Sequence, residues 1–239
     1  MKEVVWRESI EETGFAIRPE LFSHEYLDRL LHEISELSPR RSRAGVRHAL
    51  VLPPIAAVAR QPELIELARG VLGRHAFPFR ATLFDKLPAA NWLVVWHQDT
   101  ALPLRERVDL QGWGPWSLKE DVDYAHAPAA ALSQVLALRV SFDDSTGENG
   151  PLRVLPRTHT LGVLSDDSIH ELATRIAPLE CVVPKGGLVA MRPLIVHASS
   201  KSQTENPRRV LHIEYPRRVL HIEYAASDSI AAPLRLAVV

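Results

Sequence analysis

The sequence predicts a mainly β fold with flanking helices, either a sandwich or a barrel. Beyond residue 75, short runs rich in β-branched and aromatic residues are separated by turns that contain Pro, Gly and Asp. No helical pattern alternates with these runs, as a parallel βαβ sheet would require. Composition does not shift along the chain, so we expect one domain over residues 1–239, with a helical part over about 1–75 and a β core over about 76–224.

Two helices are expected in the N-terminal part. Ser23 is a suitable N-cap, and apolar residues recur at helical spacing from Tyr26 to Leu37 before Pro39 ends the run. A second helix should begin near Pro62 and end at Gly73.

The expected strands share a high content of apolar and β-branched residues. They are Phe79–Lys86, Trp92–Gln98, Ser133–Phe142, Arg153–Leu155, Glu180–Val183, Leu188–Arg192, Leu194–Ala198 and Arg209–Tyr215. Residues 99–131 read as a long, irregular connection around Gly112–Trp116. Connections of that length in a compact domain usually cover or bind a ligand.

Composition is ordinary for a soluble globular protein. Hydrophobic residues make up 46% and charged residues 24% of the 239 residues, and the net charge is -1. That charge gives no reason to expect nucleic acid or an anionic membrane as a partner. The N-terminus lacks the apolar block of a signal peptide, so we expect a cytoplasmic location. Cys181 lies in an apolar run and is expected to be a buried core residue.

A tandem repeat complicates the C-terminal part. Pro207–Tyr215 is repeated letter for letter as Pro216–Tyr224. One place in a sheet holds only one copy, so the other must bulge, extend past the sheet or add an edge strand. Arg208 and Arg217 are therefore equivalent in their local sequence.

Three residues suggest a metal site. His97 and Asp99 project to the same side if their segment is a strand. His197 ends a second apolar run about a hundred residues later. Two imidazoles and one carboxylate bind non-haem iron and leave positions open for other ligands. The alternative is that His97 packs at a strand end while Asp99 caps the following turn.

An anion-binding pair follows the last of these residues. Arg208 lies eleven residues after His197, at the start of an apolar run. A guanidinium there can bind a carboxylate through two hydrogen bonds, which suits the far end of a dicarboxylic acid. Ser199 shares the face of His197 and can donate another hydrogen bond.

The ordered set resembles the phytanoyl-CoA dioxygenase family of 2-oxoglutarate oxygenases. The resemblance runs over residues 14–215, and its other matching segments are Gly14–Ile17, Asn149–His159 and Pro207–Arg209. Arg157-Thr158 departs from the family's usual Gly-Ser. The family's spacing between the distal histidine and the arginine favours Arg208 over Arg217.

The resemblance implies a double-stranded β-helix, a jelly roll of the cupin-like barrel type, with helices packed on one sheet. His97, Asp99 and His197 would be the catalytic Fe(II) ligands. 2-Oxoglutarate would bind the iron, with its distal carboxylate on Arg208 and Ser199. O₂ would then drive hydroxylation of a C–H bond in a small organic substrate, with release of succinate and CO₂. Related halogenases lack the carboxylate, so Asp99 favours hydroxylation.

Several residues have two interpretations. Trp113 is placed with the co-substrate residues, as a cover for 2-oxoglutarate, although aromatic loop residues also pin loops to a barrel. Lys86 and Gln98 are expected at the rim. His159 and His212 are expected in structural roles, and Asn149 in a turn.

Two other functions remain open at this point. One is a cupin-type metal-dependent dioxygenase or isomerase that does not use 2-oxoglutarate. The other is a binding barrel with a degenerate site. The sequence does not identify the substrate or the oligomeric state.

Overall fold

The computed structural model describes residues 2–37, 42, 45–86, 90–107 and 109–217. Four helices precede the first long strand, and a single-turn helix and a longer one follow. They are α1 (Lys2–Thr13), α2 (His24–Glu36), α3 (Pro53–Ala59), α4 (Pro62–Leu72), α5 (Ala129–Leu132) and α6 (Asp166–Arg175), with 3₁₀ turns η1 (Ala49–Val51) and η2 (Thr158–Leu161). The Ser23 hydroxyl accepts a hydrogen bond from the Tyr26 N–H, so the predicted N-cap of α2 is confirmed.

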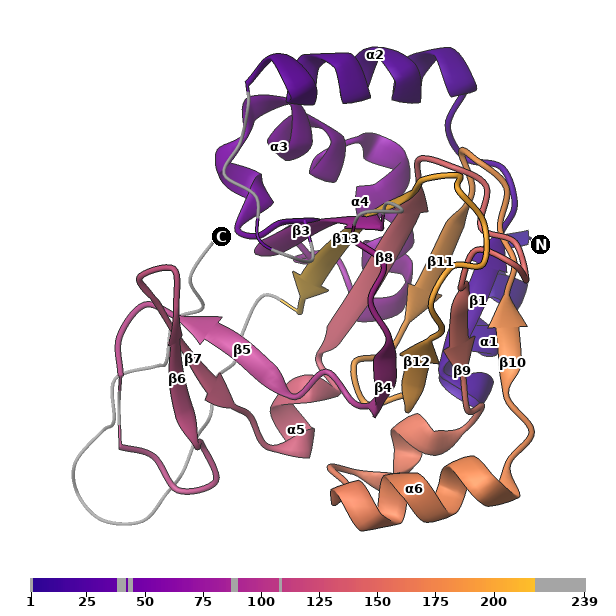
Figure 1. Ribbon diagram of the computed structural model, residues 1–239. Coiled ribbons are helices and arrows are strands. Elements are labelled where there is room, and N and C mark those ends of the chain that lie inside the picture. The colour runs from indigo at the N-terminus through magenta and orange to yellow at the C-terminus, as the bar shows by residue number, and fades with distance from the viewer. Residues whose placement is uncertain (1, 38–41, 43–44, 87–89, 108, 218–239) are drawn as a thin grey trace.

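The strands form three antiparallel sheets (Figure 1). The largest has the order β1-β11-β8-β13-β3-β2, the second β10-β9-β12-β4 and the third β5-β7-β6. Their bounds are β1 (Phe15–Arg18), β2 (Gly45–Val46), β3 (Arg80–Lys86), β4 (Val94–His97), β5 (Ala101–Leu104), β6 (Trp116–Lys119), β7 (Val122–His126), β8 (Val135–Ser141), β9 (Leu152–Val154), β10 (Leu179–Cys181), β11 (Leu188–Met191), β12 (His197–Ser199) and β13 (Arg208–Pro216).

Alternation along the strands divides the six-stranded sheet into two faces. Leu83 of β3, Leu138 of β8 and Leu211 of β13 belong to one apolar cluster with buried residues of α1, α2, α3 and α4. The residues between them, such as Thr82 and His212, line a cavity instead. One face of this sheet is therefore covered by helices, and the other is available for a site.

The four-stranded sheet lies across that second face. Side chains of β8, β9 and β11 form a second apolar cluster, which also contains Cys181 and Ile195. Two facing antiparallel sheets with helices outside the larger one confirm the predicted mainly β jelly roll. Cys181 is buried, as expected, and burial raises the pKa of its thiol to about 12, which argues against a nucleophilic role.

The expectation that residues 99–131 are irregular is wrong. They contain β5, β6 and β7, which form the separate three-stranded sheet at the left of Figure 1, and α5. Leu102, Leu104 and Trp113 of this segment belong to an apolar cluster that also contains Phe79 and Val135 of the rest of the fold. Turns of positive φ at Glu120 and Asp121 join β6 to β7, a connection that Gly or Asn would mark more clearly in a sequence.

Other elements were also missed or placed inaccurately. The sequence patterns did not predict α1, α3, α6, β1 or β2. The strand expected at Leu194–Ala198 begins only at His197, because Arg192 to Val196 form a turn closed by the Ile195 N–H bond to the Arg192 carbonyl. Within the described part of the chain, no helix has the length and apolar character needed to cross a membrane.

The tandem repeat is divided by the end of the sheet. The first copy supplies β13, which is buried between β8 and β3. The strand ends at Pro216, and Arg217 is exposed with its N–H bonded to the Gln134 carbonyl. The rest of the second copy, from residue 218, lies outside the described residues.

One buried hydrogen bond links β13 to the helical layer and gives a stability prediction. The Tyr215 hydroxyl donates to the carbonyl of Ala59, the last residue of α3, at 2.7 Å. We expect Tyr215→Phe to lower the free energy of unfolding by about 1–3 kcal/mol in urea denaturation, because the buried carbonyl loses its partner. Tyr26→Phe is the control, since that half-buried phenol accepts a 3.1 Å bond from Gln61, and an equal loss in both variants would contradict the argument.

Candidate metal centre and anion pocket

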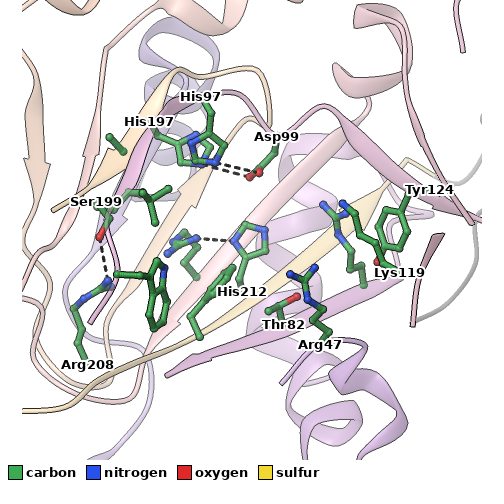
Figure 2. A pocket seen from close by; sticks show the side chains of 17 residues that line it. Arg47, Thr82, His97, Asp99, Lys119, Tyr124, His197, Ser199, Arg208 and His212 are labelled. Carbon is green, nitrogen blue, oxygen red and sulfur yellow. Dashed lines mark hydrogen bonds and ion pairs between the residues drawn. The ribbon is translucent and has the colours of Figure 1, made fainter. Parts of the chain in front are cut away.

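Strand pairing brings the two histidines together. In the antiparallel pair β4·β12, His97 lies directly opposite His197, and the ring centroids are 4.2 Å apart. Asp99 follows two residues after His97, and its backbone N–H donates to the Pro193 carbonyl at 2.9 Å. That bond holds the carboxylate beside both imidazoles (Figure 2).

Hydrogen bonds fix the orientation of both rings. Each Nδ1 lies 2.9 Å from the carbonyl oxygen two residues earlier, that of Val95 for His97 and that of Ile195 for His197. A carbonyl only accepts, so each Nδ1 carries the proton and each Nε2 keeps its lone pair. The Nε2 atoms lie 3.7 Å and 3.5 Å from the Asp99 carboxylate oxygens.

The electrostatics favour the protonation states that a metal requires. Burial, followed by the neighbouring His97, lowers the pKa of His197 to about 4, so the ring is neutral near pH 7. Burial alone would raise the pKa of Asp99, but His197 and His97 hold it well below its usual range. Metal binding needs neutral imidazole and ionised carboxylate, and both are present.

The donor set fits a non-haem iron. One ligand atom from each of His97, Asp99 and His197 lies within 4.8 Å of the other two. Two nitrogens and one oxygen on one side of a metal match the arrangement of oxygenases that keep coordination positions open. Backbone carbonyls orient both rings, which is the support that metal-binding histidines usually have.

A cavity of about 250 Å³ opens beside these three residues. Its walls come from β3, β8 and β13 of the large sheet, from β4, β9 and β12 of the second sheet, and from β6 and β7. Its other lining residues are Arg47, Arg80, Thr82, Phe84, Trp92, Val94, Lys119, Tyr124, Arg139, Leu152, Ala198, Ser199, Arg208 and His212.

A buried cationic end of the cavity is built around Ser199. The Ser199 hydroxyl donates to the Gly150 carbonyl at 2.8 Å and accepts from Arg208 at 3.2 Å and from Lys86 at 3.1 Å. The Ser199 hydroxyl proton is therefore bonded to the Gly150 carbonyl, and the Ser199 oxygen accepts hydrogen bonds from both cations. Among the described residues, neither buried cation has a carboxylate as a hydrogen-bond partner. Arg208 donates to the Asn149 carbonyl and Lys86 to the Ser200 carbonyl.

The Asn149-Gly150 turn explains part of the predicted motif. The Asn149 side chain accepts from the Thr146 N–H and donates to the Asp144 carbonyl, which confirms its turn-forming role. Gly150 has φ +68°, and a Cβ there would lie 2.2 Å from the Ser200 carbonyl oxygen. Only glycine allows this close approach, and it places the carbonyl that Ser199 binds.

Two further residues of the cavity form a buried pair. Arg139 of β8 donates to His212 Nδ1 at 2.8 Å, and its guanidinium lies 5.5 Å from the Phe84 ring centroid. Burial, and then the nearby Arg139, lower the pKa of His212 well below its usual value. His212 is therefore neutral and lines the cavity, so the purely structural role expected for it is wrong. A sequence signal for Arg139 existed, since it is the one charge within the apolar strand β8.

The expectations for three residues need correction. Trp113 does not line the cavity, because it belongs to the apolar cluster that joins its segment to Phe79. Trp92 lines the cavity instead. Lys86 and Gln98 are buried and not at the rim. The Gln98 amide donates to the Leu194 and Gly162 carbonyls and accepts from the Leu164 N–H.

His159 lies away from the metal centre. Its Nε2 is 3.2 Å from the Glu11 carbonyl, which ties the segment to α1 and agrees with the structural role expected. Arg217, the rival of Arg208, is exposed and is not among the residues that line the cavity. The first copy of the repeat therefore supplies the arginine at this site.

Comparison with known proteins identifies relatives of this chain. The family model described as "Phytanoyl-CoA dioxygenase (PhyH)" matches residues 10–210. A curated protein, L-proline trans-4-hydroxylase of Streptomyces griseoviridis, is 26% identical over 188 residues, which cover 67% of this chain. The match spans 62% of that relative, less than two thirds of its length.

Solved structures share the fold at low sequence identity. AviO1 from Streptomyces viridochromogenes Tue57 is 20% identical with a TM-score of 0.65, over 95% of this chain and 98% of that one. EctD from S. alaskensis, crystallised with bound Fe, is 18% identical with a TM-score of 0.66, over 88% and 75%. The epimerase SnoN, in complex with Fe³⁺, alpha-ketoglutarate and nogalamycin RO, is 16% identical with a TM-score of 0.68, over 99% and 94%.

Because Lys86 is buried, we expect the free energy of unfolding to depend on pH. Burial, and then Arg208 and Arg139, lower the pKa of its ammonium to about 8. Between about pH 8 and the ordinary lysine pKa of about 10.4, the unfolded chain holds more protons than the folded chain, so the free energy of unfolding rises with pH. We expect the wild type to gain at most about 3 kcal/mol relative to Lys86→Met between pH 7.5 and 10.5.

The measurement is urea denaturation of both proteins across that pH range. Lys201→Met, which removes an exposed lysine, is the control for general effects of pH. A constant difference between the wild type and Lys86→Met would show that Lys86 does not titrate differently in the folded protein.

Proposed function

The chain belongs to the phytanoyl-CoA dioxygenase family, and on that premise we propose that it is an Fe(II)- and 2-oxoglutarate-dependent oxygenase that hydroxylates a C–H bond of a small organic molecule. Members of this family use Fe(II), 2-oxoglutarate and O₂. The observation that carries the proposal is the convergence of the free Nε2 atoms of His97 and His197 with Asp99, beside a cavity that ends in Arg208.

His97, Asp99 and His197 are assigned as the iron ligands. Bound iron supplies the oxidative chemistry: one atom of O₂ enters succinate as 2-oxoglutarate loses CO₂, and the other enters the substrate C–H bond. The chain's own residues bind and orient. The carbonyls of Val95 and Ile195 keep both imidazoles in the ligating tautomer.

Arg208 is assigned as the partner of the distal carboxylate of 2-oxoglutarate. It is buried and has no hydrogen bond to a carboxylate within the described part of the chain, and a buried guanidinium of this kind gains most from a dicarboxylic ligand. Ser199 holds Arg208 and Lys86 in place through its single oxygen. Lys86 adds a second positive charge at the same end.

The substrate is proposed to be a small organic molecule on two grounds. The cavity of about 250 Å³ must also hold the co-substrate. The curated relative is a hydroxylase named for L-proline, a small molecule. SnoN, which shares the fold, is an epimerase, so the fate of the substrate C–H bond needs its own test. Incorporation of ¹⁸O from ¹⁸O₂ into the product distinguishes hydroxylation from epimerisation.

An anaerobic titration tests the iron and co-substrate assignments. Apo-protein receives Fe(II) and then 2-oxoglutarate while the visible charge-transfer band is recorded. We expect a band only when both are present, and we expect His97→Ala and Asp99→Ala to abolish it because the metal loses a ligand. His32→Ala, at an exposed histidine of α2, is the control and keeps the band.

Two outcomes would contradict this assignment. Iron binding without any response to 2-oxoglutarate would support a metal-dependent cupin-type enzyme. Failure to bind Fe(II) at all would support a binding barrel without catalytic activity.

The repeat provides a matched pair of variants for the co-substrate site. We expect Arg208→Ala to weaken 2-oxoglutarate about 10- to 100-fold, because a charge-assisted hydrogen bond of about 1.5–3 kcal/mol is lost. Arg217→Ala removes the same residue from the same local sequence but at an exposed position, and should leave the affinity unchanged. The affinity is read from the charge-transfer band, and equal effects in the two variants would remove Arg208 from the site.

A further inference from the structure

The cavity has a second cationic end, opposite the one that contains Arg208. Figure 2 shows Arg208 and Ser199 on one side of the histidines, and Lys119, Tyr124 and Arg47 on the other. Strand register gives the separation along the sheet. Arg208 pairs with Lys86 at one end of β3, and Glu214 pairs with Arg80 at the other, six positions and about 20 Å away.

The residues of this second end come from three parts of the chain. Arg47 follows β2, Arg80 begins β3, and Lys119 ends β6 in the three-stranded sheet. The Tyr124 ring joins them, because Lys119 Nζ lies 4.6 Å and the Arg80 guanidinium 5.8 Å from its centroid. The Tyr124 hydroxyl lies 3.0 Å from His48 Nε2, which fixes the ring between the three-stranded sheet and the helical layer.

Only one of these cations is neutralised within the described structure. Arg80 forms an ion pair with the buried Glu214. Among the described residues, no ion pair or hydrogen bond to a carboxylate is found for the side chains of Arg47 and Lys119. Glu120, the nearest acidic neighbour in sequence, points to His48, with its carboxylate 3.9 Å from Nδ1.

The charges in the cavity then favour an anion at this end, where Arg47 is exposed and Lys119 is half-buried. Iron and Asp99 together leave one positive charge, and 2-oxoglutarate brings two negative ones. Arg208, Lys86 and Arg139 already exceed that deficit, so the charges of Arg47 and Lys119 are left without a counter-charge. Burial, with Arg80 and Arg47 nearby, lowers the pKa of Lys119, as expected for cations that repel one another.

We propose that Arg47 and Lys119 form the substrate-anchoring site, and that the substrate carries a carboxylate or phosphate group that they bind. This inference rests on the proposed function, because it divides the cavity between co-substrate and substrate. The anionic group lies at the Arg47 and Lys119 end, 2-oxoglutarate at the Arg208 end, and the metal ligands in between. The C–H bond to be oxidised is the one that this anchor places beside the metal.

Tyr124 and β6 give the site its selectivity. The apolar ring forms the wall against which Lys119 rests, so the substrate is expected to present an apolar body next to its anionic group. β7 pairs with both β6 and β5, so Lys119 of β6 and Tyr124 of β7 reach the cavity from one three-stranded sheet.

Isothermal titration calorimetry with benzoate tests the anchor. The protein carries Fe(II) and saturating 2-oxoglutarate without O₂, so that the Arg208 end is occupied. We expect saturable binding of benzoate, no binding of the neutral analogue benzamide, and about tenfold weaker benzoate binding in Arg47→Gln and in Lys119→Gln, since each removes one charge-assisted contact. Arg69→Gln, at an exposed position of α4, is the control and leaves binding unchanged.

Inorganic phosphate in the same titration distinguishes the two kinds of anionic group. Tighter binding of phosphate assigns a phosphorylated substrate, and tighter binding of benzoate assigns a carboxylic acid. Equal benzoate affinity in the wild type, Arg47→Gln and Lys119→Gln would overturn the proposal, as would the absence of saturable binding of either anion.

Failure of the anchor and failure of the proposed function give different results. If the charge-transfer band fails to form, calorimetry still reports benzoate binding. Benzoate binding is then also measured in Arg208→Ala, to identify which end of the cavity binds it. If Arg208→Ala abolishes benzoate binding and Arg47→Gln has no effect, the second site is overturned.

Discussion

The pairing of β4 with β12 places His97 opposite His197, and the rest of the site depends on this register. Side chains alternate across a sheet, so a slip of one residue would turn either histidine away from the cavity. Neighbouring strands prevent such a slip, because β12 also pairs with β9, where His197 faces Val154 and Ser199 faces Leu152. The β9·β12 pairing runs unbroken through both His197 and Ser199, whereas the β4·β12 register shifts between these two residues.

The larger sheet separates stability from function by its two faces. The helix-facing residues of β3, β8 and β13 form the apolar cluster that holds the protein together. On the opposite face, the same strands carry Arg139, Arg208, Lys86 and His212 into the interior. Buried cations reduce stability unless their charge is satisfied. Here Lys86 donates to the Ser199 hydroxyl, and Arg208 donates to the Asn149 carbonyl. A molecule that keeps such charges inside is adapted to bind anions.

The three-stranded sheet completes the cavity from outside the barrel. It carries Lys119 and Tyr124, and the contact of Tyr124 with His48 connects it to the helical layer. The two ends of the cavity are thus built in different ways. The Arg208 end belongs to the core sheets, whereas the opposite end combines a loop after β2 with the β6–β7 hairpin. Loops and added hairpins can change substrate preference without disturbing the barrel.

The sequence alone determined the mainly β fold, the cap of α2, and the candidate ligands His97, Asp99 and His197, because strand parity and caps are properties of residues close in the chain. It did not reveal Arg47, Lys119 or Arg139 as cavity residues, and it misplaced Lys86 and Trp113. Contacts between sheets and between distant strands leave no local pattern. The repeat shows this most directly: Arg208 and Arg217 have identical neighbours in sequence, and only the end of the sheet at Pro216 makes one buried and the other exposed.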